Sequence, residues 1–135
     1  MKISRQDNTR KQGDQGMGIA IAWFTCNNYT VCIPLTDSQQ YDLIVDKDNI
    51  ISRVFVRTTT QVNKFGKYQV GLRTSGGNKS HVKVTLFDKT CVELLFIVSG
   101  NGECYLIPSN EIECTTGLYL SKKYEKYIVY LSPSV

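Results

Sequence analysis

The stretch YDLIVDKDNIISRVFVRTTT, residues 41–60, decides the fold because it reads as two short apolar strands joined by the polar turn DKDN. Apolar residues recur at every second position on both sides of the turn, which is the pattern of a β-hairpin. The valines of VFVR are expected on one face of the second strand. Phe55 and Arg57 then share the other face with Asp42, while Asp46 and Asp48 are expected to form the turn.

Around this hairpin the sequence predicts one mixed α/β domain, with α+β character and a mixed sheet, over residues 14–135. Residues 1–13 are polar and basic, and we expect either a disordered lead-in or a flexible arm that orders on a phosphate backbone. A dense apolar run predicts a helix over residues 14–26 with Asp14 as its N-cap. Strands are expected over residues 29–33, 68–72, 94–98, 104–107, 118–120 and 127–131, with a hairpin turn at 100–102, a short turn or helix over 108–112, and either strand or helix over 83–93.

The composition is that of a soluble globular protein, with 41% apolar and 21% charged residues. A net charge of +4 permits a polyanionic partner without requiring one. The chain start lacks the apolar segment of a signal peptide, and no run approaches the ~18 apolar residues of a membrane span. Cys26, Cys32, Cys91, Cys104 and Cys114 lack C-x-x-C spacing, and the single histidine lies apart from them, so we expect reduced, mostly buried thiols in a cytoplasmic, reducing setting.

Asp42 is the candidate metal ligand of the hairpin, although the local pattern alone favours a solvated strand residue. A magnesium site would need a second oxygen ligand beside it, together with waters. The position of Phe55 would supply that ligand, but a phenyl ring has no ligand atom. The position of Arg57 would carry a lysine that orients or deprotonates water, whereas a guanidinium stays protonated and can only clamp a phosphate.

The polar segment RTSGGNKSH, residues 73–81, is expected to be a surface loop. Its glycines permit close approach of a ligand, and its basic, hydroxyl and amide residues are the types that contact phosphates and base edges. An exposed loop with ordinary turn chemistry explains the composition as well. With the nearby strand ends it gives these candidate nucleic-acid-binding residues: Thr58, Thr59, Lys64, Lys67, Arg73, Ser75, Asn78, Lys79 and Ser80.

The segments that carry a family resemblance are GMGIAIAWF, the following NYTVCIPLTDSQQ with the hairpin, and the later YQVGLRTSGGNKS, FDKTCVELLFIV and CYLIPSNEI. Together they resemble the PD-(D/E)XK homing endonucleases of group I introns in cyanobacteria and phages. The resemblance covers almost the whole chain. It implies a restriction-endonuclease-like core, Mg²⁺-dependent cleavage of double-stranded DNA, and assembly as a homo-oligomer, a dimer or tetramer. Asp42 matches the family's metal-binding aspartate.

The sequence departs from this family in the second half of its motif. Active relatives read V-Q-V-K-T where this chain has VFVRT, so Phe55 takes the place of the glutamine and Arg57 that of the catalytic lysine. Some relatives also carry a helix glutamate near Met17. Three hypotheses follow: a DNA-binding protein whose cleavage is lost or strongly impaired, an active Mg²⁺-dependent homing endonuclease with an altered site, and an RNA or ribonucleoprotein cofactor that acts in splicing or inhibits a nuclease.

Overall fold

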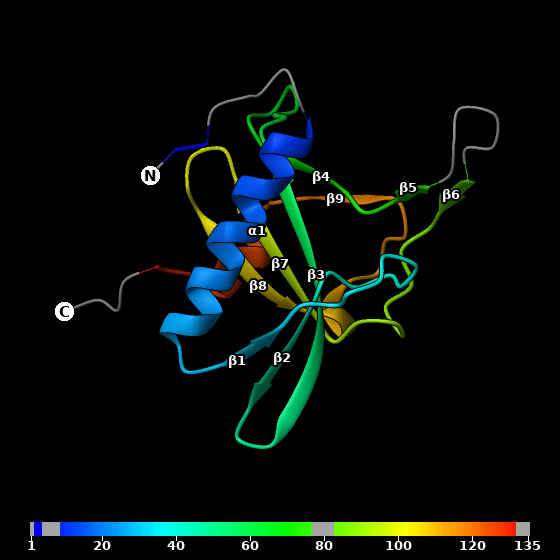
Figure 1. The fold of residues 1–135 in the computed structure, drawn as a ribbon. Coiled ribbons are helices and arrows are strands. Elements are labelled where there is room, and N and C mark those ends of the chain that lie inside the picture. Colours follow the sequence, from blue (N-terminus) through cyan, green and yellow to red (C-terminus); the bar gives the residue numbers. More distant parts are fainter. Residues whose placement is uncertain (1, 4–8, 77–82, 132–135) are drawn as a thin grey trace.

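A six-stranded sheet forms the centre of the molecule, in the order β1-β2-β3-β7-β8-β10, and one long helix lies against it (Figure 1). This computed structural model describes residues 2–3, 9–76 and 83–131. The fold is mixed α/β, as the sequence predicts, and its main sheet is mostly antiparallel. The elements are α1 Thr9–Cys26, β1 Thr30–Cys32, β2 Leu43–Lys47, β3 Ile50–Thr59, β4 Gln69–Gly71, β5 Thr74–Gly76, β6 Lys83–Thr85, β7 Leu94–Ser99, β8 Cys104–Pro108, η1 Ser109–Glu111, β9 Gly117–Tyr119, η2 Lys122–Tyr127 and β10 Ile128–Val129.

The predicted hairpin is the pair β2 and β3, in which Leu43 lies opposite Val54. Its two-residue turn places Asp48 and Asn49 at φ of 53° and 64°. Such left-handed turns match the twist of the flanking strands, and Asp and Asn tolerate the conformation well. Asp48 is therefore a turn residue as predicted. The same prediction is wrong for Asp46, which lies on β2 and pairs with β3 on one side and β1 on the other.

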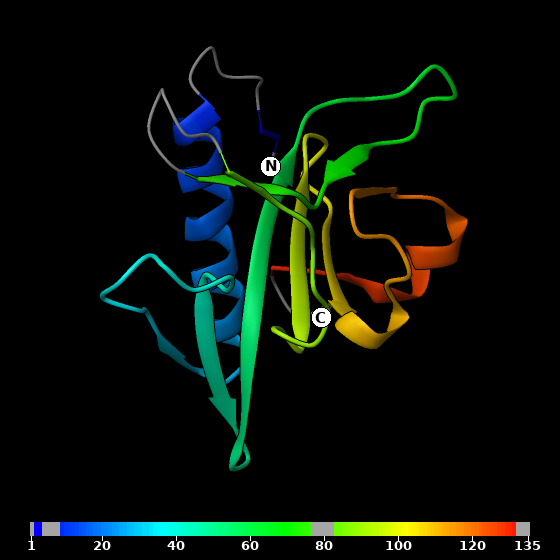
Figure 2. The same cartoon turned by 90° about the vertical axis from the view of Figure 1, so that its right-hand side faces the viewer.

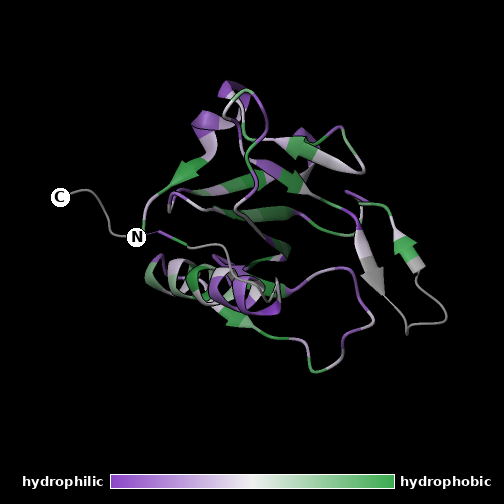
Figure 3. Cartoon of the chain, turned by 90° about the horizontal axis from the view of Figure 1, so that it is seen from above, coloured by the Kyte–Doolittle hydropathy of each residue, from purple (hydrophilic) through white to green (hydrophobic). Residues whose placement is uncertain are grey.

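The strand β7 runs parallel to β3 on one side and antiparallel to β8 on the other, which leaves it central and buried on both faces. Its run LLFIVS places alternate side chains in two separate cores. One core lies between the sheet and α1, and the other between the sheet and the segments that carry β4, β9 and η2. Figure 3 shows the helix on one side of the strands and the smaller sheets beyond the other.

The helix α1 begins at Thr9, five residues before the expected start, so Asp14 is not its N-cap. Trp23 and Phe24 pack against Phe96 of β7, with ring centroids 5.8 and 5.5 Å away. A Cβ atom on Gly16 would lie 1.7 Å from Thr58 Oγ1 of β3. Only glycine lets the helix backbone approach the strand this closely, and so this contact fixes the helix over the sheet.

The polar segment predicted as a loop is in part a second small sheet, because β5 and β6 pair antiparallel on either side of residues 77–82. The segment 83–93 thus begins as a strand and continues without regular structure to β7. The expectation of mostly buried thiols is wrong. All five cysteines are described and free, but Cys104 alone among them is buried. No helix among the described residues is long and apolar enough to cross a membrane.

Candidate catalytic and nucleic-acid-binding sites

Asp42, Phe55 and Arg57 share one face of the hairpin, as the alternation predicts. Asp42 directly precedes β2, where the ladder to β3 ends, and its backbone N–H donates to the Val54 carbonyl at 2.8 Å. Its Oδ2 then accepts a hydrogen bond of 2.7 Å from the Val56 N–H. The carboxylate therefore satisfies a β3 amide that has no strand partner at this point, which fixes its position on the sheet.

The Phe55 ring fills the core instead of facing a ligand. It is 3% exposed and lies with its centroid 5.3 Å from that of Phe87. The Arg57 guanidinium carbon lies 3.9 Å from the Phe55 centroid, within cation–π distance, and Nη1 donates to the Val56 carbonyl. The guanidinium is thus held against the ring of the residue two positions before it.

Burial shifts the pKa values of the two charged groups of this site in opposite directions. It raises the pKa of Asp42, although the Val56 N–H and the charge of Arg57 oppose the shift. It lowers the pKa of Arg57, with Asp42 opposing. Each charge is therefore only partly compensated for its removal from water. Uncompensated charges of this kind are more frequent at functional sites than elsewhere in proteins.

Two of the predicted nucleic-acid-binding residues have buried hydroxyl groups. Thr58 Oγ1 is buried against α1 and has no hydrogen-bond partner. Thr59 is buried as well, and its hydroxyl donates to the Gln69 carbonyl and accepts from the Gln61 N–H. Neither hydroxyl can reach a phosphate without unfolding the end of β3. We therefore leave both threonines out of the nucleic-acid surface.

Lys64, Lys67 and Arg73 are exposed on either side of β4 in the sequence, and β4 pairs with β9. Alternation along KYQVGLR turns Lys67, Gln69, Gly71 and Arg73 outward, while Tyr68, Val70 and Leu72 pack into the core. Two hollows lie on this outer surface. One of about 240 Å³ is lined by Gln69, Arg73, Thr116, Gly117, Leu118 and Tyr119; the other, of about 430 Å³, by Asn63, Lys64, Phe65, Lys67, Tyr119 and Ser121.

Phe65 and Tyr119 are the residues of this surface that the sequence analysis missed. They are 74% and 51% exposed, and Tyr119 contributes to both hollows. An aromatic residue between two lysines in NKFGK was the available signal for Phe65. No signal in the sequence pointed to Tyr119, because its neighbour Gln69 is fifty positions away and only the β4–β9 pairing joins them.

The remaining candidates belong to the β5–β6 segment. Ser75 lies on β5, where its backbone pairs with Val84. Asn78, Lys79 and Ser80 lie outside the described residues. These four positions therefore remain sequence-based predictions.

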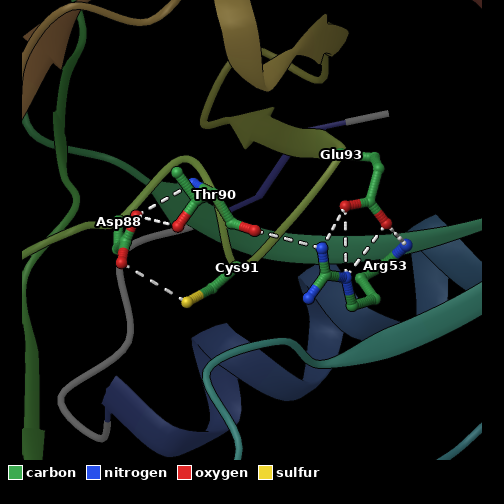
Figure 4. A network of polar contacts seen from close by, with 5 residues as sticks. All are labelled: Arg53, Asp88, Thr90, Cys91 and Glu93. Atoms are coloured by element: carbon green, nitrogen blue, oxygen red, sulfur yellow. Dashed lines mark hydrogen bonds and ion pairs between the residues drawn. The ribbon is translucent and has the colours of Figure 1, made fainter.

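A polar network joins the middle of β3 to the segment that precedes β7 (Figure 4). The Arg53 guanidinium donates to both carboxylate oxygens of Glu93, and its Nη2 also donates to the Thr90 carbonyl. Glu93 Oε1 accepts from the Arg53 backbone N–H at 2.8 Å. Asp88 holds Thr90 and Cys91 by hydrogen bonds of its own. The network ties the approach to β7 onto β3, and we assign it a structural role.

The α1 helix covers one face of the mixed sheet, and Asp42 lies on the opposite face of the β2–β3 hairpin. Residues 7–126 match the model of the family described as PD-(D/E)XK endonuclease, so the chain belongs to that family. A search of solved structures finds a bacterial homing endonuclease, I-Ssp6803I, with a TM-score of 0.72 and 21% identity over 88% of this chain and 82% of that chain. No curated protein matches.

The side chains of the hairpin do not fit the Mg²⁺ ion that such nucleases usually use. Magnesium requires near-octahedral oxygen coordination from carboxylates, carbonyls and waters. Asp42 offers a carboxylate, the phenyl ring of Phe55 offers no donor atom, and Arg57 brings a positive charge beside the carboxylate. Among the described residues, no group of three or more His, Cys, Asp or Glu side chains is placed to hold a metal ion.

Proposed function

We propose that this protein binds double-stranded DNA and that its cleavage activity is lost or strongly impaired. The observation that carries the proposal is the packing of the Phe55 ring in the core with the Arg57 guanidinium against it. These are the positions where the resemblance places a glutamine ligand and a catalytic lysine. The fold of the family is retained, while the donor atoms of its site are replaced.

The loss of cleavage follows from the chemistry of the two replacements. Phe55 removes one oxygen ligand and closes the space with a ring. Arg57 stays protonated at any working pH despite the burial that lowers its pKa, so it cannot accept a proton from water. When several groups act together in catalysis, removal of one of them abolishes most of the rate enhancement. Asp42 alone does not replace them.

The retention of DNA binding is supported by the exposed face of β4. Lys64, Lys67 and Arg73 keep their charges in water, free to neutralise phosphates, and they lie beside hollows bordered by backbone and amide groups. A Cβ on Gly117 would lie 2.9 Å from the Val70 carbonyl oxygen, so glycine keeps the two strands close. Three exposed cysteines without disulfides suit an intracellular, reducing setting.

The test is a magnesium-dependence assay on the DNA that flanks the gene. Cleavage is followed on a gel, and binding is followed in parallel with and without Mg²⁺. We expect the parent protein to bind without cutting. We expect the double variant Phe55→Gln with Arg57→Lys, once shown to be folded by circular dichroism, to cut in Mg²⁺ and not in EDTA.

The control is the same double variant with Asp42→Asn, which should bind and not cut. Efficient cleavage by the parent protein would contradict the proposal and favour the active endonuclease. Absence of any duplex binding would also contradict it and would favour an RNA partner.

A further inference from the structure

The larger hollow on the outer surface is bordered by two exposed aromatic rings from distant parts of the chain. Phe65 lies in the turn between β3 and β4, and Tyr119 ends β9. Figure 2 shows this turn, in green, projecting at the upper right on the side that carries β9 and η2. Large aromatic side chains at 74% and 51% exposure bury little surface in the folded chain, so core packing does not account for their presence.

The turn that presents Phe65 is held by its own hydrogen bonds. Asn63 Oδ1 accepts from the backbone N–H groups of Phe65 and Lys67, both at 2.9 Å. The Asn63 N–H donates to the Lys67 carbonyl at 2.8 Å, and Gly66 supplies the left-handed residue at φ of 77°. An exposed ring on a preformed turn loses little conformational entropy when a ligand binds. The turn is built to present the ring.

Two lysines line the hollow, and two more follow one of its lining residues in the sequence. Lys64 and Lys67 line it, and the Lys64 ammonium lies 5.1 Å from the Phe65 ring centroid. Ser121 lines it on the other side and is followed by two exposed lysines, Lys122 and Lys123. Glu125, further along η2, is the acidic residue of that segment. The charge therefore complements a polyanion.

We propose that this hollow binds one unstacked nucleobase of a DNA strand against the rings of Phe65 and Tyr119, with Lys64 and Lys67 on the flanking phosphates. Aromatic rings between cations are the combination by which proteins hold unstacked bases, since every base has a π-face and every nucleotide a charge. The proposal rests on the proposed function in taking DNA as the ligand. It adds a base-binding element outside the hairpin site.

The test measures binding by fluorescence anisotropy to three probes of fixed length: a paired duplex, the same duplex with one unpaired thymine, and single-stranded oligothymidine. We expect Phe65→Ala and Tyr119→Ala each to weaken binding of the last two probes by roughly 5- to 150-fold, and binding of the paired duplex much less. Phe65→Trp should retain tight binding. The matched control is Tyr130→Ala, which removes a 72% exposed ring outside the hollow and should change nothing.

A second arm replaces single thymines of the bound oligonucleotide by abasic sites. One abasic position should weaken binding to the parent protein as much as Phe65→Ala does, and should weaken the variant no further. An oligouridine of equal length shows whether RNA provides the base as well. Equal binding by Phe65→Ala, Tyr119→Ala and parent protein on every probe would overturn the inference while leaving the proposed function in place. Failure of all nucleic-acid probes to bind the parent protein would overturn both.

Discussion

The hairpin site and the outer surface of β4 hold similar side chains in opposite environments. In the hairpin site a phenylalanine and an arginine are enclosed, with Phe55 at 3% exposure and Arg57 stacked on it. On the outer surface a phenylalanine and its neighbouring lysines face water. The comparison teaches that burial decides the role of each group. Enclosed, the ring holds the fold together and the charge costs free energy; exposed, both remain available to a ligand.

The largest expected effect comes from removing each of the two phenylalanine rings in turn. Phe55→Ala should lower the free energy of unfolding by about 3–5 kcal/mol, because it deletes a buried aromatic side chain and leaves a cavity. Phe65→Ala should change it by less than about 0.5 kcal/mol, because the ring is mostly in water. Urea unfolding of both variants measures the two values. Equal losses would mean that the two rings have the same role and would break the comparison.

The next effect concerns the charges. The triple variant Lys64→Ala, Lys67→Ala, Arg73→Ala should weaken duplex binding and reduce the slope of log K against log salt by about 0.9 for each phosphate contact removed. Arg57→Met should reduce this slope less than any one of the three, because its guanidinium is stacked on Phe55. Titrations at several salt concentrations give the slopes. A larger effect from Arg57 would place the phosphate contacts at the hairpin instead.

A smaller effect is expected from the buried carboxylate. Burial raises the pKa of Asp42 in the folded protein, so its contribution favours folding below the ordinary carboxyl pKa and is lost as pH rises through the raised value. Asp42→Asn keeps an acceptor for the Val56 N–H without the charge, and should gain stability relative to the parent as pH rises through the raised pKa of Asp42. The advantage should vanish at low pH. Unfolding at a series of pH values measures it, with the exposed Asp37→Asn as control.

The smallest effect should come from Glu93, and it should have the opposite sign. Its hydrogen bonds to Arg53 hold its pKa below the ordinary value, so its stabilisation is present above that value and is lost as pH falls through the depressed one. Glu93→Gln should therefore lower stability slightly at neutral pH and not in acid. The loss is small because both side chains are about two-fifths exposed. The same pH series and added salt measure it, and a loss that persists in 1 M salt would contradict the surface origin.

Local patterns in the sequence predicted the elements that depend on neighbouring residues. Period-2 alternation gave the hairpin and placed Asp42 with Phe55 and Arg57 on one face. The apolar run of β7 gave a central strand. Membership in the PD-(D/E)XK endonuclease family and the mixed fold are confirmed as well. Each of these conclusions rests on residues close together in the chain or on a motif.

The features that could not be predicted from the sequence depend on tertiary contacts. Three glycines in α1 argue against helix, but the packing of Gly16 on Thr58 offsets their poor propensity and lets the helix begin at Thr9. Thr58 and Thr59 looked accessible because the alternation could not show which elements would cover the end of β3. Tyr119 joins the outer surface only through the pairing of β9 with β4.

The stacking of Arg57 on Phe55 also bears on how such a site changes over generations. Each residue lies in the environment that the other creates: the ring shields the guanidinium, and the guanidinium covers the ring. A single substitution at either position therefore removes a contact of the other residue, so the effects of the two substitutions on stability should not add. A change of both residues together does not leave the guanidinium half-buried beside a missing ring.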